Sequence, residues 1–160
     1  MKNCIFCKIA RGEIPCWKIY EDEKFLAFLD INPFVEGHTL VIPKKHYRWV
    51  WEVTELGEYF EVVRKIANHF QKVMTDEFVA SLIWGLDVPH AHIHLLPKPY
   101  DLKLFALGER RKLTPEKASE LVSKLRLNAS PHMIHFHLWL KGKKFGRLLP
   151  SINNLKGMFP

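Results

Sequence analysis

Three histidines alternate with apolar residues in the segment Pro89-His90-Ala91-His92-Ile93-His94-Leu95-Leu96-Pro97. Successive side chains of a β-strand point to opposite faces, so the three histidines would share one face and the apolar residues would share the other. A single histidine on a strand is usually a hydrogen-bonded structural residue, but three in register indicate a site. Neutral imidazoles ligate metal ions and also act as nucleophiles, acids or bases, and the pattern leaves both chemistries open.

A second group of potential ligands lies near the N-terminus, where two residues separate Cys4 from Cys7. This spacing suits zinc, but a tetrahedral structural site then needs two histidines from elsewhere. His46, at the end of a predicted strand, and one histidine of the 90–94 set can supply them. The alternatives are a redox-active dithiol and two unrelated buried thiols. Cys16 has no partner at a useful spacing, and we predict that it is a small apolar residue.

The elements that must position these residues include both strands and helices. Apolar residues recur with a helical period over 55–74, and Thr114-Pro115-Glu116 has the cap, proline and acid that begin a short helix over 115–126. Five apolar or β-branched segments are predicted to be strands: 17–20, 24–29, 39–42, 78–83 and 91–96. The short connections favour an α+β class, with an antiparallel sheet of about five strands, one long helix and one short helix.

The composition is that of an ordinary globular protein, because 48% of the 160 residues are apolar and 26% are charged. The longest mainly apolar run, residues 78–86, is too short to cross a bilayer, and no apolar stretch follows the basic N-terminus as a signal peptide requires. Three cysteines, an odd number, argue against a disulfide framework. We therefore expect a cytoplasmic protein.

The net charge of +7 is uneven, since residues 127–160 carry five basic side chains and no acidic one. We predict one domain over 1–126 and a basic C-terminal extension of unknown role over 127–160. The extension contains His132, His135 and His137, but the first spacing is three residues rather than two, and we assign it no catalytic role. Binding to nucleic acid is expected only through this extension, if it occurs.

Four segments together resemble the histidine triad (HIT) superfamily, in its bacterial zinc-containing branch. They are Cys4–Ile9 with Gly12–Pro15, Phe25–Pro33, Gly37–His46 and the histidine segment itself. The segments follow the family's order at compatible separations and span residues 4–126. The resemblance implies a HIT-like fold and a nucleotide hydrolase or nucleotidyltransferase. It also implies a homodimer, and we expect the long helix to pair with its copy and bury Tyr59 and Val63.

The resemblance also implies roles for individual residues. His92 would attack the α-phosphorus of a nucleotide and form a nucleotidyl-histidine intermediate, while His94 and His38 hold the phosphate and orient the nucleophile. Asp30 would bind the ribose hydroxyls, which suits a carboxylate with two acceptor oxygens. The implied substrates are purine dinucleoside polyphosphates or nucleoside phosphoramidates. The residues that would line the base pocket are Ile5, Phe6, Ile9, Phe28 and Ile31.

In zinc-containing members of the family, the ligands implied are Cys4, Cys7, His46 and His90, around a structural Zn²⁺, and the reaction requires no catalytic metal. The sequence also departs from the family pattern, because Leu86 stands where a glutamine is frequent. Asp87 either protonates a leaving group or caps the turn. Two alternatives therefore stay open: a nucleotide-sensing or scaffold protein with little turnover, and a zinc-dependent hydrolase whose triad binds a catalytic metal.

Overall fold

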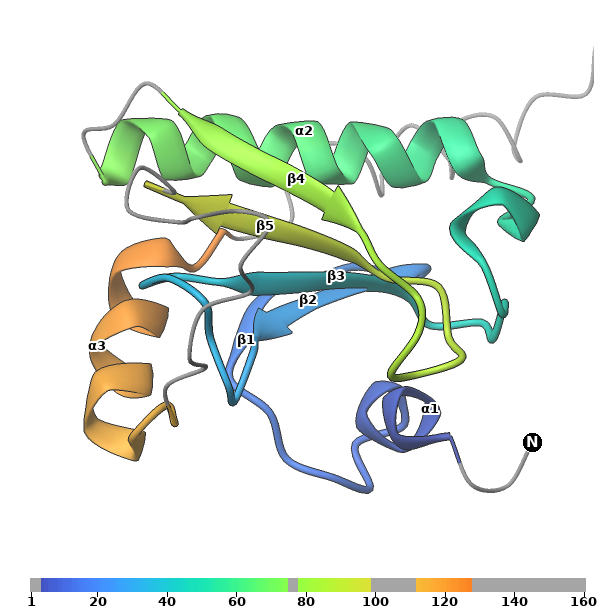
Figure 1. Cartoon of the computed structure of the whole chain (residues 1–160), viewed down its shortest axis with the longest axis horizontal. Helices are drawn as coiled ribbons and strands as arrows, with labels where there is room; N and C mark the ends of the chain where they lie inside the picture. Colours follow the sequence, from blue (N-terminus) through green and yellow to red (C-terminus); the bar gives the residue numbers. More distant parts are fainter. Residues whose placement is uncertain (1–3, 75–77, 99–111, 128–160) are drawn as a thin grey trace, which may run out of the picture. The chain divides into compact units, whose positions relative to one another are not determined.

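A computed structural model describes residues 4–74, 78–98 and 112–127 of the chain, in which helices pack around one antiparallel sheet (Figure 1). The α+β class and the sheet of five strands are as predicted. A six-residue helix at the N-terminus and a short 3-10 helix were not anticipated. The elements are α1 (Ile5–Ala10), β1 (Lys18–Glu21), β2 (Phe25–Leu29), β3 (Thr39–Pro43), η1 (Val50–Glu52), α2 (Leu56–Val73), β4 (Val79–Ile83), β5 (Ile93–Pro97) and α3 (Pro115–Leu125).

The sheet has the strand order β1-β2-β3-β5-β4, and every neighbouring pair is antiparallel. Strand β5 therefore lies inside the sheet, between β3 and β4. In its register Leu40 of β3 and Leu82 of β4 both lie opposite His94. The order places His94 of β5 inside the sheet, where strands on both sides hold its backbone.

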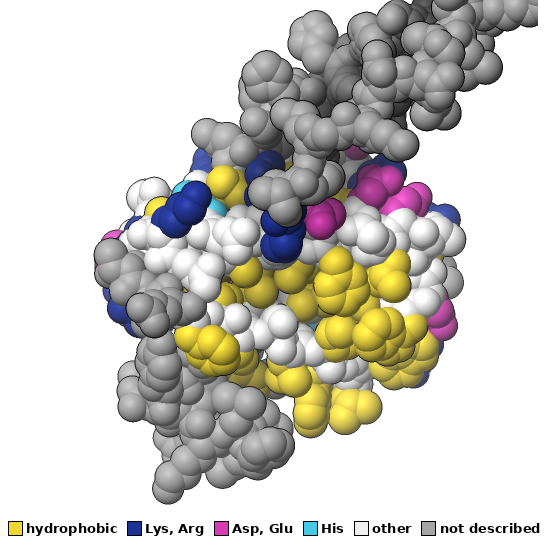
Figure 2. All heavy atoms as spheres, turned by 90° about the horizontal axis from the view of Figure 1, so that it is seen from above, with side chains coloured by type: hydrophobic (Ala, Val, Ile, Leu, Met, Phe, Trp, Pro, Cys, Tyr) yellow, Lys and Arg dark blue, Asp and Glu magenta, His cyan; other side chains and the backbone are white. Residues whose placement is uncertain are grey.

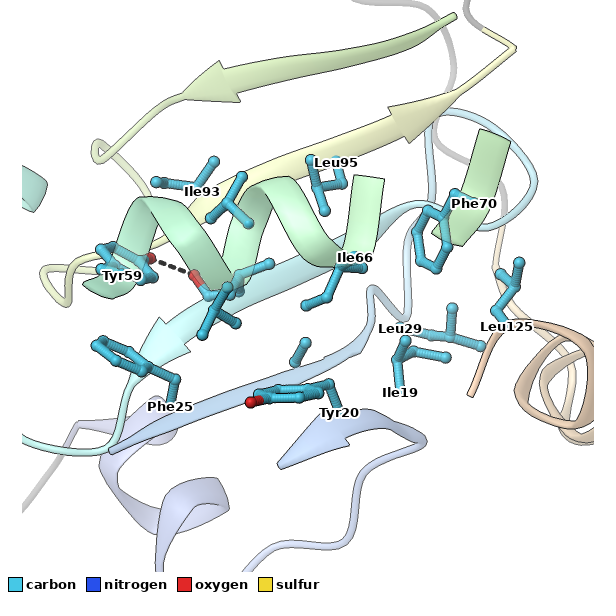
Figure 3. Close-up of a cluster of buried hydrophobic side chains, with 14 of the residues drawn as sticks. Ile19, Tyr20, Phe25, Leu29, Tyr59, Ile66, Phe70, Ile93, Leu95 and Leu125 are labelled. Atoms are coloured by element: carbon cyan, nitrogen blue, oxygen red, sulfur yellow. Dashed lines mark hydrogen bonds between the residues drawn. The ribbon is translucent and has the colours of Figure 1, made fainter. Parts of the chain in front are cut away.

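The larger part of the core lies on the face of the sheet that α2 and α3 cover (Figure 3). Ile66 and Phe70 of α2 are fully buried there against β5 residues Ile93 and Leu95. The Tyr59 ring stacks on Phe25, and its hydroxyl donates a hydrogen bond to the Val41 carbonyl, so a buried polar group is satisfied. Apolar burial of this kind is the dominant favourable term in folding.

Helix α3 begins as its sequence predicts. The Thr114 side chain accepts a hydrogen bond from the Lys117 N–H, Pro115 is in the first turn, and Glu116 is an acid near the positive end of the helix dipole. Its buried residues Ala118, Leu121 and Leu125 extend the α2 side of the core. The predicted end of this helix, at residue 126, is one residue beyond the observed end.

The histidine segment is only partly a strand. The regular strand begins at Ile93, because the Ala91 N–H donates to the Tyr47 carbonyl at 2.7 Å instead of joining the sheet ladder. The predicted alternation still holds through the extended residues that precede the strand. Ala91, Ile93 and Leu95 belong to the core on the α2 side, whereas the rings of His90 and His92 contact Phe6 of α1.

The prediction that Tyr59 and Val63 of the long helix pair with a second copy is wrong. Tyr59 is fully buried and Val63 is only 7% exposed, both in the protein's own core. The apolar stripe of α2 was identified correctly, but it faces the sheet. The exposed aromatic residue of this helix is Phe60, which is 40% exposed.

Apart from Leu127, the predicted C-terminal extension lies outside the described residues, as do His132, His135 and His137. The Leu127 N–H donates to the Ile19 carbonyl at 2.8 Å, which joins the end of α3 to the beginning of the sheet. Among the residues that the structure describes, no helix has the length and apolar character needed to span a bilayer.

Candidate functional site

Two cysteines and two histidines meet where α1 approaches the ends of β3 and β5. The Cys7 sulfur lies 3.2 Å from Nδ1 of His46 and 3.5 Å from Nδ1 of His90, and the Cys4 sulfur lies 3.4 Å from the same His90 nitrogen. All four potential ligand atoms lie within 4.8 Å of one another. The fold therefore joins residues that are up to 86 positions apart in the sequence into a Cys₂His₂ cluster.

The environment of His90 determines which of its nitrogens faces the cysteines. Its Nε2 lies 2.8 Å from the Pro43 carbonyl, which can only accept, so Nε2 carries the proton and Nδ1 presents its lone pair to the sulfurs. Burial lowers the pKa of His90 to about 4, which keeps the ring neutral. A neutral imidazole with its second nitrogen bonded to a carbonyl is the usual state of a metal-ligating histidine.

The chemistry of this donor set fits zinc. Two sulfur and two imidazole donors with one ligand atom each match the tetrahedral Cys₂His₂ site, and soft thiolates favour zinc over calcium or magnesium. Burial, followed by the interaction with Cys4, raises the pKa of Cys7, so the thiolate needs a nearby cation to form. A divalent ion would supply that charge.

His92 is held in a single tautomer by the backbone. Its Nδ1 lies 2.7 Å from the His90 carbonyl and must donate to it, so the lone pair of the neutral ring is on Nε2. The ring is only 5% exposed, and burial lowers its pKa despite the opposing effects of the hydrogen bond to the His90 carbonyl and of the Asp30 and Asp87 charges. His92 is therefore a neutral imidazole with an unprotonated nitrogen, which is the form that acts as a nucleophile.

His38 and His94 form a hydrogen-bonded pair next to His92. The Phe34 N–H donates to Nδ1 of His38 at 3.2 Å, so the proton of the neutral His38 ring is on Nε2. This Nε2 lies 2.8 Å from Nδ1 of His94 and donates to it, which places the His94 proton on Nε2. One backbone amide thus fixes the tautomers of two successive rings. The ring centroids of His92 and His94 are 4.9 Å apart, so the pair adjoins His92.

Asp30 lies at the other side of this pair. Its Oδ1 accepts from the Asn32 N–H at 2.8 Å, and its Oδ2 is 3.8 Å from Nδ1 of His38. Asp30, His38 and His94 can also be considered as a metal site, since their ligand atoms lie within 4.8 Å of one another. However, both His38 nitrogens and Nδ1 of His94 are already used in the hydrogen bonds described above. We therefore interpret the group as a hydrogen-bonded network.

The three triad histidines do not converge on one point, which argues against the catalytic-metal alternative. His90 directs Nδ1 toward the cysteines, whereas Nδ1 of His92 is bonded to a carbonyl and that of His94 is bonded to His38. In the described ranges, the groups able to hold a metal divide His90 and His94 between two clusters and omit His92.

The predicted base-pocket residues separate into two sets. Phe6, Ile9 and Phe28 are buried together in a small apolar cluster between α1 and the sheet. In contrast, Ile5 is 45% exposed and Ile31 is 59% exposed. The first set forms a wall in the folded chain, and the second set lies at the surface, where a bound molecule can cover it.

Sequence reasoning missed several groups that organise the site. The Pro43 carbonyl and the Phe34 N–H are backbone groups, and no side-chain pattern signals them. Gly85 is a third case, because an added Cβ would lie 2.5 Å from the Trp49 ring, and this close packing holds the loop that precedes the histidines. The glycine is visible in the sequence, but its contact partner 36 positions away is not.

The HIT domain family model matches residues 11–100. An uncharacterized HIT-like protein of Borreliella burgdorferi is 36% identical over 80% of this chain and 99% of its own length. The adenylylsulfatase HINT3 of Arabidopsis thaliana is 36% identical over 78% of this chain and 68% of its own. The adenosine 5'-monophosphoramidase hnt1 of Schizosaccharomyces pombe is 36% identical over 61% of this chain and 75% of its own.

Solved structures agree with these relationships. A HIT-like protein from Bartonella henselae has a TM-score of 0.70 and 33% identity, covering 79% of this chain and 96% of its own. A zinc-bound histidine triad protein from Mycobacterium smegmatis has a TM-score of 0.62 and 32% identity, covering 78% of this chain and 94% of its own.

Proposed function

Because this chain belongs to the HIT domain family, we propose that it is a nucleotide hydrolase or transferase whose nucleophile is His92. The single observation that carries the proposal is the hydrogen bond from Nδ1 of His92 to the His90 carbonyl, because it leaves the lone pair on Nε2. Relatives named adenylylsulfatase and adenosine 5'-monophosphoramidase support an enzyme that acts on adenosine nucleotides.

In the proposed reaction, Nε2 of His92 attacks the α-phosphorus and forms a P–N bond as the bond from phosphorus to the leaving group breaks. The leaving group departs with the electron pair and takes up a proton. Water then attacks the same phosphorus, the P–N bond breaks, and the nucleoside monophosphate leaves with His92 restored. The His94 Nε2–H, oriented through His38, would donate to a phosphate oxygen as charge develops there.

The remaining predicted residues would bind the nucleoside. Asp30 would accept hydrogen bonds from the ribose hydroxyls, since a carboxylate offers two acceptor oxygens to a vicinal diol. The buried Phe6, Ile9 and Phe28 would form the inner wall of the base pocket, and the exposed Ile5 and Ile31 would cover its rim. Purine dinucleoside polyphosphates and nucleoside phosphoramidates are the proposed substrate classes.

Zinc would be held by Cys4, Cys7, His46 and His90. When bound, it would supply the charge that stabilises the thiolates of the buried Cys7 and the partly buried Cys4, and it would fasten α1 to the sheet. The proposal assigns the metal no contact with the substrate, because the chain's own imidazoles provide the nucleophile and the hydrogen-bond donor. A cytoplasmic location remains a prediction from the sequence.

The test is mass spectrometry of the intact protein mixed with an adenosine 5'-phosphoramidate or a dinucleoside polyphosphate. The expected result is a protein carrying one adenylyl group on His92, which disappears on longer incubation. A sensing or scaffold protein would instead bind the nucleotide without forming this adduct or releasing product. Adenylylation at another residue would contradict the assignment of His92.

A homodimer is the proposed assembly, and β4 with the outer side of α2 is the proposed contact surface. Strand β4 pairs only with β5 in the described part of the sheet, so its other edge presents backbone groups that a second strand can bind.

Hydrophobic side chains gather on the face shown in Figure 2, toward which α2 and β4 lie in Figure 1. Large exposed apolar residues of α2, β4 and the adjoining segments are Phe60, Phe78, Ile83, Trp84 and Leu86. Light scattering that reports only 18.8 kDa at micromolar concentration would exclude this dimer.

A further inference from the structure

The Cys₂His₂ cluster and the His92 ring share two structural connections, although they would perform different tasks. The first is His90 itself. Its Nδ1 faces the two sulfurs, while its own carbonyl, 2.7 Å from Nδ1 of His92, fixes the tautomer of the next histidine. Any shift of the His90 ring toward or away from the cysteines therefore acts on the residue that orients the proposed nucleophile.

The second connection is the Phe6 ring, which lies between the two sites. Phe6 is in α1, whose flanking and internal cysteines belong to the cluster, and it is only 7% exposed. Its ring meets the rings of His90 and His92 edge to face. The centroid of the Phe6 ring is 5.8 Å from that of His90 and 5.3 Å from that of His92. The Phe28 ring packs against the Phe6 ring, with 5.7 Å between the two centroids, and limits the movement of the Phe6 ring.

Helix α1 is held in place by tertiary contacts, namely the burial of Phe6 and Ile9 against the sheet and the cysteines of the cluster. It has six residues, its N-cap residue Cys4 makes no side-chain capping hydrogen bond, and no acid lies in its first turn. A helix of this length is not stable by itself, so its position depends on tertiary contacts. The cysteines are the contacts that a bound metal would strengthen, and Phe6 moves with them.

We propose that Phe6 and the His90 carbonyl are positioning groups that couple the Cys₂His₂ cluster to His92, so that metal occupancy sets the rate of attack at phosphorus. The inference rests on the proposed function, since it concerns the same nucleophile. In this view the metal does more than stabilise the fold, because a folded protein with an empty cluster would transfer the nucleotidyl group slowly.

The experiment measures single-turnover adenylylation of His92 at saturating nucleotide, so that changes in nucleotide affinity do not enter the rate. Wild type and Phe6→Leu are compared, each loaded with Zn²⁺ and after removal of Zn²⁺ by a chelator. Phe70→Leu is the matched control, because it makes the same substitution at a buried site on the opposite face of the sheet. Circular dichroism records whether each metal-free protein remains folded.

We expect Phe6→Leu and metal removal each to slow adenylylation about tenfold or more. The two changes together should slow it much less than the product of the two separate factors, because both act through one contact. Phe70→Leu should leave the rate nearly unchanged. Rate effects that multiply independently, or a Phe6→Leu rate equal to that of the control, would overturn the coupling.

A second measurement decides the case in which the metal-free protein unfolds. Because the Phe6 ring packs against the ring of the proposed ligand His90, Phe6→Leu should weaken Zn²⁺ binding by about tenfold in a chelator competition, as changes around metal ligands commonly do. Phe70→Leu should not. Equal affinities for Phe6→Leu and wild type would reject the inference, whereas the absence of any adenylylated His92 in wild type would reject the proposed function instead.

Discussion

The two faces of the sheet are stabilised by different means. On the α2 side, an 18-residue helix buries residues such as Ile66 and Phe70 completely. On the α1 side, a six-residue helix covers a much smaller apolar cluster, and the imidazoles of His90, His92 and His94 take the place of aliphatic side chains. The larger apolar core therefore lies on one face, and the groups to which we assign the chemistry lie on the other. A histidine-rich face is not closed by apolar burial alone, so we expect α1 to rely on the Cys₂His₂ cluster as well as on the burial of Phe6 and Ile9.

The largest effect is expected at His92, the proposed nucleophile. His92→Asn should lower turnover by at least about 10³-fold, because the nitrogen proposed to attack phosphorus is lost, while nucleotide affinity stays close to that of wild type. Steady-state rates and equilibrium binding to the same nucleotide measure the two quantities. A variant that retains more than a few per cent of the activity would show that another residue attacks.

Removal of the metal tests whether the α1 side needs a ligand. At free Zn²⁺ about 1,000 times the dissociation constant, chelation should lower the free energy of unfolding by about 4 kcal/mol. Hydrogen exchange should show the amides of α1 losing protection first, while those of α2 stay protected. Equal loss over both helices would mean that the two faces are not independently stabilised. Cys16→Ser serves as the control, since Cys16 is outside the cluster.

The α2 side should respond in the opposite way. Ile66→Ala removes a fully buried side chain and should cost about 2–5 kcal/mol in the free energy of unfolding, while the turnover of the folded protein stays near that of wild type. Chemical denaturation and steady-state kinetics are the measurements. Ile66→Val, expected to cost only about 0.5–1.5 kcal/mol, provides the graded control. If Ile66→Ala lost more turnover than its fraction of unfolded protein accounts for, the two faces of the sheet would not have separate roles in stability and activity.

The smallest effect is expected at the start of α3. Thr114→Ala removes the side-chain oxygen that accepts from the Lys117 N–H and should cost about 1 kcal/mol, without a change in turnover. Thr114→Ser keeps the oxygen and should retain most of the stability. If both variants lose stability equally in thermal unfolding, the hydroxyl is not the stabilising group.

Much of this arrangement was predictable because it follows from local patterns. The alternation from His90 to Leu95 placed the imidazoles and the aliphatic residues on opposite sides, which the core contacts of Ile93 and Leu95 and the contacts of His90 and His92 with Phe6 confirm. The α+β class, the five strands and the Thr114 cap were also visible in the sequence. In contrast, α1 was missed, because six residues with no capping side chain carry too weak a periodic signal.

The apolar stripe of the long helix shows where such patterns mislead. The periodicity correctly grouped Tyr59 and Val63, but a stripe of apolar residues does not reveal whether it faces the protein's own sheet or a second copy. The structure places both residues in the internal core and leaves Phe60 exposed. Only the packing of α2 on the sheet distinguishes these cases.

The amino-acid sequence alone determined the kinds of groups available: three imidazoles in alternation, two thiols at zinc spacing and one carboxylate upstream. Tertiary structure decided the state of each group. The Pro43 carbonyl turns the lone pair of His90 toward the cysteines, the His90 carbonyl leaves Nε2 of His92 unprotonated, and the Phe34 N–H orders the His38–His94 pair. The physical reason is that an imidazole tautomer is set by its hydrogen-bond partner, and these partners are backbone groups, two of which come from other strands and loops.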